Sequence, residues 1–287
     1  MIETNHRWCA KTHSQLAAGA NNPKKPMHAV ALIEGLPISL ASHEETLSEI
    51  GRAISAGEKG RYISITNSES MYHGLRTPAL GCYIQNADFS LCDGIGVCIA
   101  GWAWGHHLAR FPGPVLQLEC SRHGVSKGWR HFFYGGKEGV AEEMARRLKE
   151  KYPGLVVCGI HVPPFRALTA NEDDNVVRLI NESRPDIVWV GLGCPKQDQW
   201  IAQHLGRIDA AWMVGVGAAF DFHAGTVPWA PAYMRALGLE WLFRTIVQPR
   251  LRAKRTWWSA LYVVRAFFSG LLTGQFLRRP MLYRPDD

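Results

Sequence analysis

The chain has 287 residues, of which 47% are hydrophobic, enough for a sizeable core in one large or two small domains. Its formal net charge of +7 is concentrated at one end, because nine Lys and Arg residues from Trp241 onward face only Asp286 and Asp287. The rest of the chain is neutral. This balance argues against a nucleic-acid-binding core and favours a local anionic partner for the basic tail.

The seven cysteines are scattered through apolar segments and form no C-x-x-C pair. We therefore expect reduced, buried thiols rather than a disulfide framework or a metal site. The N-terminus lacks the apolar stretch of a signal peptide, and no uninterrupted apolar run reaches the ~18 residues of a membrane-spanning helix. These features predict a cytoplasmic protein.

The first ordered element is expected near Val30. Residues 1–28 mix polar residues with Gly, Asn and Pro without a period, which is typical of a disordered leader. Ser42 and Glu45 have the spacing of a capping box, and this predicts a helix that runs to about Gly57.

A strand is predicted at Tyr62–Thr66, and it ends at Asn67. Asparagine at a strand-to-helix junction is a good helix cap. The carboxyl end of a strand is also where a side chain can touch a ligand, so Asn67 has two possible roles. A helical segment follows from Glu69 to about Gln85, with a break at Pro78.

Asp93 follows a predicted strand at Asp88–Cys92 and precedes a helix that starts with Gly94. An aspartate before a glycine is common in turns. Here it lies between two strongly apolar segments, where a partly desolvated carboxylate can act as a general base. Both interpretations stay open at this point.

Strands and helices alternate through the following segment. A strand ends at Gly135 and Gly136, an amphipathic helix covers Val140–Lys149, and Thr169 with Glu172 forms a second capping box. This alternation predicts an α/β fold with a Rossmann-like, doubly wound, mainly parallel sheet.

The stretch DIVWVGLGCPKQDQWIAQHLGRIDAAWMVGVGAAFDFHAG contains two more strands, each of which ends in a glycine loop. In a parallel sheet such loops meet at one edge, where backbone N–H groups and helix N-termini bind anions. We therefore expect a site at residues 191–197 and 215–221.

Neither glycine loop completes a dinucleotide fingerprint, because Lys196 and Phe220 occupy the position of the third glycine. There is no GxxxxGK[ST] motif. The acidic cluster at residues 172–174 lies in the first turn of a helix, where we expect it to be solvated. The sequence thus favours a site without a metal or a bound cofactor.

The C-terminal segment combines aromatic, aliphatic and basic residues. On a helix, Leu261, Val264, Phe268 and Leu271 share one face, and Arg265 interrupts the apolar run. Such a helix suits an anionic membrane surface. The alternative is a helix that packs on the body of the protein with a solvated basic face.

Several segments, taken together and in this order, resemble the WecG/TagA/CpsF glycosyltransferases, glycosyltransferase family 26. The resemblance covers about Ile33 to Arg255. Its motifs are TNSE, NADFSLCDGIG, FFYGG, VGLGCPKQDQW, GVGAAFDFHAGTVPWAP and GLEWLFR.

The resemblance implies a bacterial hexosyltransferase that moves a sugar from a UDP-sugar to a polyprenyl-diphosphate-linked saccharide, with inversion and without a metal. It places the catalytic base at Asp93, a pocket asparagine at Asn67 and a glutamine at Gln197. The family often has threonine where this chain has Ile65, which weakens the case for a hydroxyl contact there. The candidate substrate-binding residues are Thr66, Asn67, Gly94, Gly135, Gly136, Gly191, Gly193, Pro195, Lys196, Gln197, Phe220, Asp221, Arg244, Arg250 and Arg252.

The expected organisation is a disordered leader (1–28), a glycosyltransferase domain (29–239) and a membrane-associating basic appendage (240–287) on the inner face of the cell membrane. A homo-oligomer is possible, and no nucleic acid is expected as a partner. Phe220 and Asp221 either line a uridine pocket or support the core. Two other functions stay open: a non-catalytic UDP-sugar sensor at the membrane, and a nucleotide-dependent oxidoreductase, which the missing third glycine disfavours.

Overall fold

The computed structural model describes residues 28–273 and 282–283, with the backbone alone at residues 251–255 and 282–283. The predicted leader and the end of the predicted appendage lie outside the described residues. The chain forms two compact units. Unit one comprises the described residues of Met1–Ser42, Ser64–Pro112 and Trp229–Asp287, and unit two comprises His43–Ile63 and Gly113–Pro228.

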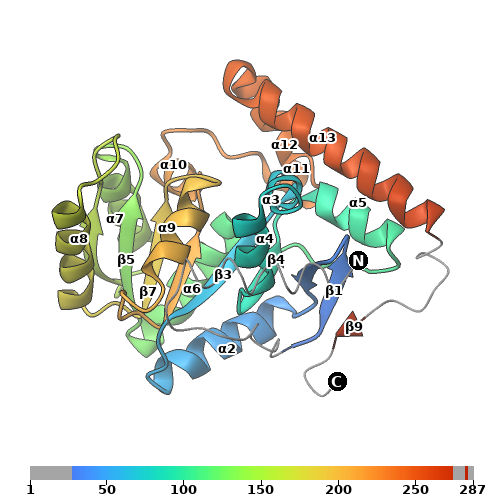
Figure 1. The fold of residues 1–287 in the computed structure, drawn as a ribbon. Helices are drawn as coiled ribbons and strands as arrows, with labels where there is room; N and C mark the ends of the chain where they lie inside the picture. The colour runs from blue at the N-terminus through green and yellow to red at the C-terminus, as the bar shows by residue number, and fades with distance from the viewer. Residues whose placement is uncertain (1–27, 274–281, 284–287) are drawn as a thin grey trace. The chain divides into compact units, whose positions relative to one another are not determined.

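Unit one contains a small antiparallel sheet and a group of helices (Figure 1). The sheet has the order β2-β1-β9. The elements of unit one are β1 (Val30–Ile33), β2 (Leu36–Ser39), α3 (Ser68–Gly74), α4 (Pro78–Gln85), β4 (Phe89–Cys92), α5 (Ile95–Ala103), α11 (Ala232–Ala236), α12 (Glu240–Val247), α13 (Pro249–Leu272) and β9 (Leu282–Tyr283).

Unit two alternates strands and helices. Its elements are α2 (His43–Ser55), α6 (Gly113–Lys127), β5 (Arg130–Gly135), α7 (Val140–Lys151), β6 (Val156–His161), α8 (Ala170–Glu182), β7 (Ile187–Gly191), α9 (Lys196–His204), β8 (Trp212–Gly215) and α10 (Ala219–Ala224). Strand β3 (Arg61–Thr66) begins in unit two and ends in unit one.

The main sheet has six strands in the order β4-β3-β8-β7-β5-β6, and the pairs from β3 to β6 are parallel. Adjacent residues of β5 point to opposite faces. Phe133 packs edge-on against Phe220 of α10, whereas Tyr134 stacks on Trp200 of α9 at 4.3 Å. Helices therefore cover both faces in unit two, which confirms the predicted doubly wound α/β fold.

Local sequence signals place several helix ends as predicted. Thr169 and Glu172 form the capping box that opens α8. The acidic cluster in this first turn is accessible to solvent, as predicted, and its members also form ion pairs. Glu172 pairs with Arg166 at 2.6 Å, and Asp173 and Asp174 both pair with Arg207, at 2.7 and 2.9 Å.

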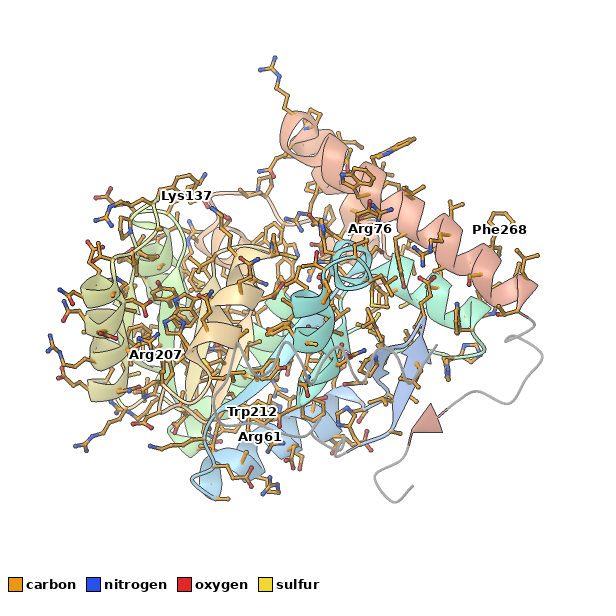
Figure 2. The ribbon with its side chains drawn as sticks, in the orientation of Figure 1. Arg61, Arg76, Lys137, Arg207, Trp212 and Phe268 are labelled. Carbon is orange, nitrogen blue, oxygen red and sulfur yellow. The ribbon has the colours of Figure 1, made fainter. Side chains whose placement is uncertain are left out.

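Two buried polar residues are part of the core of unit two. Arg61 is 4% exposed, pairs with Glu49 at 2.6 Å and with Glu58 at 3.0 Å, and lies over the Trp212 ring (Figure 2). His131 is fully buried and accepts a hydrogen bond from Trp189 Nε1 at 3.0 Å. Burial lowers the pKa of His131 to about 4.

One face of the long helix α13 packs against the other elements of unit one. Trp104 Nε1 donates to the Ala266 carbonyl at 3.1 Å, and Tyr72 stacks on Trp258. The opposite face is exposed, as predicted, at Leu261, Val264, Phe268 and Leu271, and Phe268 projects from the helix (Figure 2). Among the described residues no helix is both long and apolar enough to cross a membrane.

Candidate functional site

The candidate residues of unit one gather where β3 and β4 end. Asn67 caps α3, since its Oδ1 accepts hydrogen bonds from the backbone N–H groups of Glu69 and Ser70 at 2.9 and 3.0 Å. A Cβ added at Gly94 would lie 3.9 Å from Asn67 Cβ. The cap role is therefore confirmed, and the same residue lies beside the start of α5.

Thr66 is fully buried, and its hydroxyl belongs to a chain of three. Its Oγ1 lies 3.0 Å from Ser64 Oγ and 2.9 Å from Ser90 Oγ. The predicted substrate contact is thus not available to the Thr66 hydroxyl, because that hydroxyl points into the interior and joins β3 to β4. Alternation along a strand explains this, since the side chain of Thr66 shares the inner face with that of Ser64.

Asp93 occupies the turn between β4 and α5 and is partly exposed. Its backbone N–H donates to the Thr66 carbonyl at 3.0 Å, which fixes the turn against the end of β3. Gly94 then takes the N-cap position of α5 in extended geometry. The structure therefore brings Asp93, Gly94 and Asn67 together, as the sequence predicts.

A second carboxylate, which sequence reasoning missed, lies near Asp93. Glu240 is the first residue of α12, and its Oε2 accepts from Trp229 Nε1 at 3.4 Å. Burial raises the pKa of Glu240, the Asp93 carboxylate raises it further, and Arg244, 3.9 Å away, opposes both effects. Unit one thus holds two acidic groups that influence each other.

Backbone packing explains how α12 comes to begin there. A Cβ at Gly238 would lie 2.8 Å from Ile95 Cβ, so the chain before Glu240 packs directly on the first turn of α5. Glu240 falls within the GLEWLFR motif, which was the available signal. It is 147 positions from Asp93, however, and spacing could not connect the two.

Arg110 is another residue that the sequence did not single out. Its Nη2 donates to the carbonyls of Arg235 and Ala236, at 2.8 and 2.9 Å, and so satisfies the end of α11. The hydrogen bond between the Cys92 and Cys98 thiols raises the pKa of Cys92 and lowers that of Cys98, and the Arg110 charge is a smaller, lowering influence on both. A cation is therefore present in the segment that follows α5.

The three predicted arginines of the appendage differ in setting. The side chain of Arg244 is 19% exposed and faces Glu240. Arg250 is exposed in the first turn of α13. The side chain of Arg252 lies outside the described residues.

In unit two, the glycine loops after β5 and β7 contact each other through their backbones. The Gly136 N–H donates to the Gly191 carbonyl at 3.1 Å. Gly135 has φ +106°, and a Cβ there would lie 2.9 Å from the Gly191 carbonyl carbon. Only glycine fits this approach, because a side chain would meet the facing backbone.

Phe220 supports these loops from the interior. It is 1% exposed, and a Cβ at Gly191 would lie 2.8 Å from its ring. The core-supporting role is the one that fits this burial. Asp221 is partly exposed and closes the turn after α10, since its Oδ1 accepts from the Thr226 hydroxyl at 3.2 Å.

The loop after β7 leads into α9. Gly193 has φ +78°, and the Cys194–Pro195 bond is cis. Lys196 is exposed, with its Nζ 4.9 Å from the centroid of the Phe165 ring.

Gln197 follows and is 5% exposed. Its backbone N–H donates to the Gly193 carbonyl at 2.9 Å. Its Oε1 accepts no hydrogen bond from the described residues, and it faces Gly217, where an added Cβ would lie 3.4 Å away.

Unit two is thus a Rossmann-like α/β body with glycine loops at the carboxyl ends of its strands, and unit one carries the acidic turn. The model of the Glycosyl transferase WecG/TagA/CpsF family matches residues 31–276, and the chain belongs to that family.

Two curated relatives share one name, N-acetylglucosaminyldiphosphoundecaprenol N-acetyl-beta-D-mannosaminyltransferase. The relative from Bacillus spizizenii is 30% identical over 226 residues, which are 78% of this chain and 84% of the relative. The relative from Staphylococcus aureus is 30% identical over 187 residues, which are 65% of this chain and 72% of the relative.

Proposed function

We propose that this protein is an inverting glycosyltransferase that moves a sugar from a UDP-sugar to a polyprenyl-diphosphate-linked saccharide in bacterial surface polysaccharide synthesis. The observation that carries the proposal is the position of Asp93, a partly exposed carboxylate held at the end of β4 in a chain of this family. A base with this access can meet a bound hydroxyl group.

The reaction follows from that assignment. The Asp93 carboxylate removes the proton of an acceptor hydroxyl while the hydroxyl oxygen bonds to the anomeric carbon of the donor. The bond from that carbon to the UDP phosphate breaks on the opposite side, and UDP leaves with the bonding electrons. One displacement of this kind inverts the anomeric configuration.

We assign donor binding to the loops of unit two. Gly193 has no atom within 4 Å of its Cβ position, so a diphosphate can approach the backbone of this loop closely, while Gly135, Gly136 and Gly191 hold the loops together through their own contacts. The unsatisfied Oε1 of Gln197 supports this assignment, because buried acceptors are normally paired and a donor-sugar hydroxyl or uracil N–H would pair with it.

The departing UDP needs positive charge. We propose that at least one of Arg244, Arg250 and Arg252 contacts its diphosphate, and that no metal ion is required. If UDP affinity and transfer rate stay unchanged after replacement of each arginine in turn, that assignment fails. If transfer is lost in EDTA and restored by a divalent cation, metal independence fails.

The names of the two relatives favour N-acetylmannosamine as the donor sugar and N-acetylglucosaminyl-diphospho-polyprenol as the acceptor. An enzyme that uses a lipid-linked acceptor acts at a membrane surface. The exposed apolar face of α13, together with the basic residues of the same segment, supports peripheral binding to the anionic inner face.

The test is UDP release with a panel of UDP-sugars, each with and without a short-chain polyprenyl-diphosphate-linked N-acetylglucosamine. We expect one donor to give acceptor-dependent release and a product of inverted configuration by NMR. UDP-sugar binding without turnover, across all acceptors, would instead support the sensor function.

A further inference from the structure

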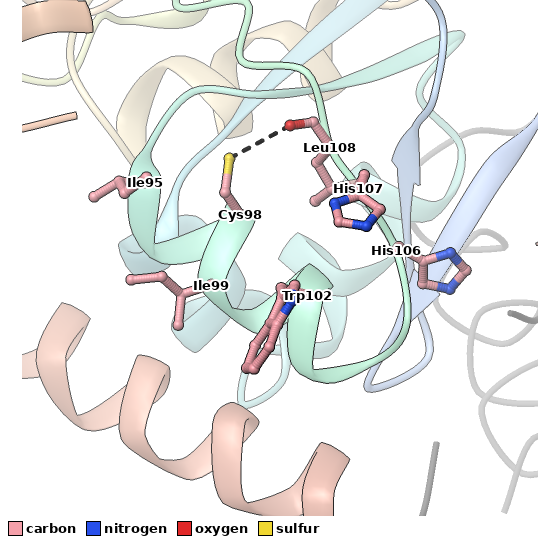
Figure 3. A pocket seen from close by; sticks show the side chains of 7 residues that line it. All are labelled: Ile95, Cys98, Ile99, Trp102, His106, His107 and Leu108. Carbon is pink, nitrogen blue, oxygen red and sulfur yellow. Dashed lines mark hydrogen bonds between the residues drawn. The ribbon is translucent and has the colours of Figure 1, made fainter. Parts of the chain in front are cut away.

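A cavity of about 310 Å³ lies beside α5, between this helix and the segment that follows it (Figure 3). Its walls are mainly apolar and include Ile95, Ile99, Trp102 and Leu108. Cys98 lines it as well, with its Sγ 3.7 Å from the Leu108 carbonyl oxygen. The cavity belongs entirely to unit one.

The cavity begins next to the proposed base. Ile95 is two residues after Asp93 and lies in the first turn of α5. Ile99 and Trp102 follow at helical spacing, so the three side chains share one face. With a rise of 1.5 Å per residue, this face runs roughly 10 Å away from the Asp93 end of the helix.

The far end of this face meets the apolar surface of α13. The Trp102 ring stacks on Phe267 with centroids 6.0 Å apart. Ile99 is 38% exposed and Trp102 is 44% exposed, and the neighbouring Phe268 is 56% exposed. Clustered exposure of large apolar side chains marks a binding surface. An apolar path therefore leads from the turn at Asp93 to the face that we assign to the membrane.

We propose that this cavity binds the isoprenoid chain of the lipid-linked acceptor, at the end next to its diphosphate. The inference rests on the proposed function. In an acceptor whose sugar hydroxyl meets Asp93, the diphosphate lies one sugar away and the isoprenoid chain lies beyond it. The path has the same order, since it starts at the carboxylate and continues along apolar side chains.

A positive charge lies in the same segment. Arg110 follows the cavity residue Leu108 by two positions, and its Nη2 donates to the carbonyls of Arg235 and Ala236 at 2.8 and 2.9 Å. A diphosphate held near Arg110 would leave the apolar cavity to the first isoprene units. Burial lowers the pKa of the His106 imidazole, whereas His107 is exposed.

The first test uses the unmodified protein. Iodoacetamide should alkylate Cys98, and peptide mass spectrometry can follow its rate beside that of Cys158, another partly exposed thiol. We expect farnesyl-diphosphate-linked N-acetylglucosamine to slow alkylation of Cys98 at least fivefold, with no change at Cys158. Equal protection by the methyl-diphosphate-linked saccharide, or by a fatty acid, would overturn the inference.

The second test measures acceptor KM. Ile99→Asp should raise the KM for the farnesyl-linked acceptor about tenfold, since a charge in the cavity opposes burial of a hydrocarbon chain. The KM for the methyl-linked acceptor and for the UDP-sugar should stay unchanged. Leu179→Asp is the matched control, because Leu179 has similar exposure, 41%, on α8.

The outcomes separate the inference from the proposed function. If the wild-type protein transfers sugar but chain length and Ile99→Asp have no effect on KM, the cavity does not bind the isoprenoid chain. If no acceptor supports transfer while the farnesyl compound still protects Cys98, the cavity assignment stands and the proposed function fails. Ile99→Phe, which fills the cavity with an apolar group, provides a second variant if the aspartate disrupts folding.

Discussion

Gly191 and Phe220 offer a double-mutant test of how the glycine loops are held. A Cβ at Gly191 would lie 2.8 to 2.9 Å from three atoms of the Phe220 ring, closer than a carbon contact allows. Overpacking of this kind costs about 1–3 kcal/mol. We therefore expect Gly191→Ala to destabilise unit two and to displace the loop, which would weaken UDP binding by about tenfold.

Removal of part of the ring should relieve the clash. Phe220→Leu alone should cost about 1–2 kcal/mol, as a large-to-small change in the core. The double variant should lose less unfolding free energy than the sum of the two single losses, by about 1 kcal/mol or more. Urea unfolding gives the free energies, and calorimetric titration gives UDP affinity.

Gly193→Ala is the matched control in the same loop. It carries backbone strain at φ +78°, but nothing lies within 4 Å of its Cβ position. The stability lost in Gly193→Ala should therefore add to the stability lost in Phe220→Leu. If Gly191→Ala and Phe220→Leu were also additive within about 0.5 kcal/mol, the packing argument would be refuted.

Three further predictions concern buried ionisable groups. The pKa of His131 falls from 6.5 to about 4 on folding, so the protein should keep its full stability above pH 6.5 and lose about 2 kcal/mol of it at pH 5. Urea unfolding should show this loss in the wild type and not in His131→Phe. Folding raises the pKa of Glu240, so the stability of the wild type should decline as the pH rises through that pKa. Unfolding measured at pH 5 and at pH 8 should show this decline in the wild type, and Glu240→Gln should lack it. Glu49→Gln should lower the free energy of unfolding by about 1–3 kcal/mol, because its partner Arg61 is buried. Glu143→Gln is the control and should lower it by under about 1 kcal/mol, because the arginine partners of Glu143 are exposed. Equal shifts in melting temperature for the two variants would contradict this.

The sequence was most informative where a local rule sets the backbone. Glycines after apolar strands gave the loops at Gly135 and Gly191, and the Thr169 capping box gave the start of α8. The break at Pro78 divides α3 from α4, because proline cannot continue a helix interior.

The sequence was least informative where distant segments meet. Glu240 and Asp93 interact across 147 positions, and the cavity wall depends on how α5 packs against the segment that holds Leu108. Burial was equally hidden. The Thr66 hydroxyl lies inside the protein rather than at the site, since a strand of mixed polar and apolar residues does not reveal which face is covered.

Replacement of Asp93 tests the central claim most directly. Asp93→Asn keeps the size of the side chain and removes the base. With the donor and acceptor that the wild type uses, we expect acceptor-dependent UDP release to fall by about 10²-fold or more, with UDP affinity unchanged. Asp209→Asn, at an exposed ion pair with Lys59, should retain full activity. Release by Asp93→Asn at the wild-type rate would contradict the assignment of Asp93 as the base.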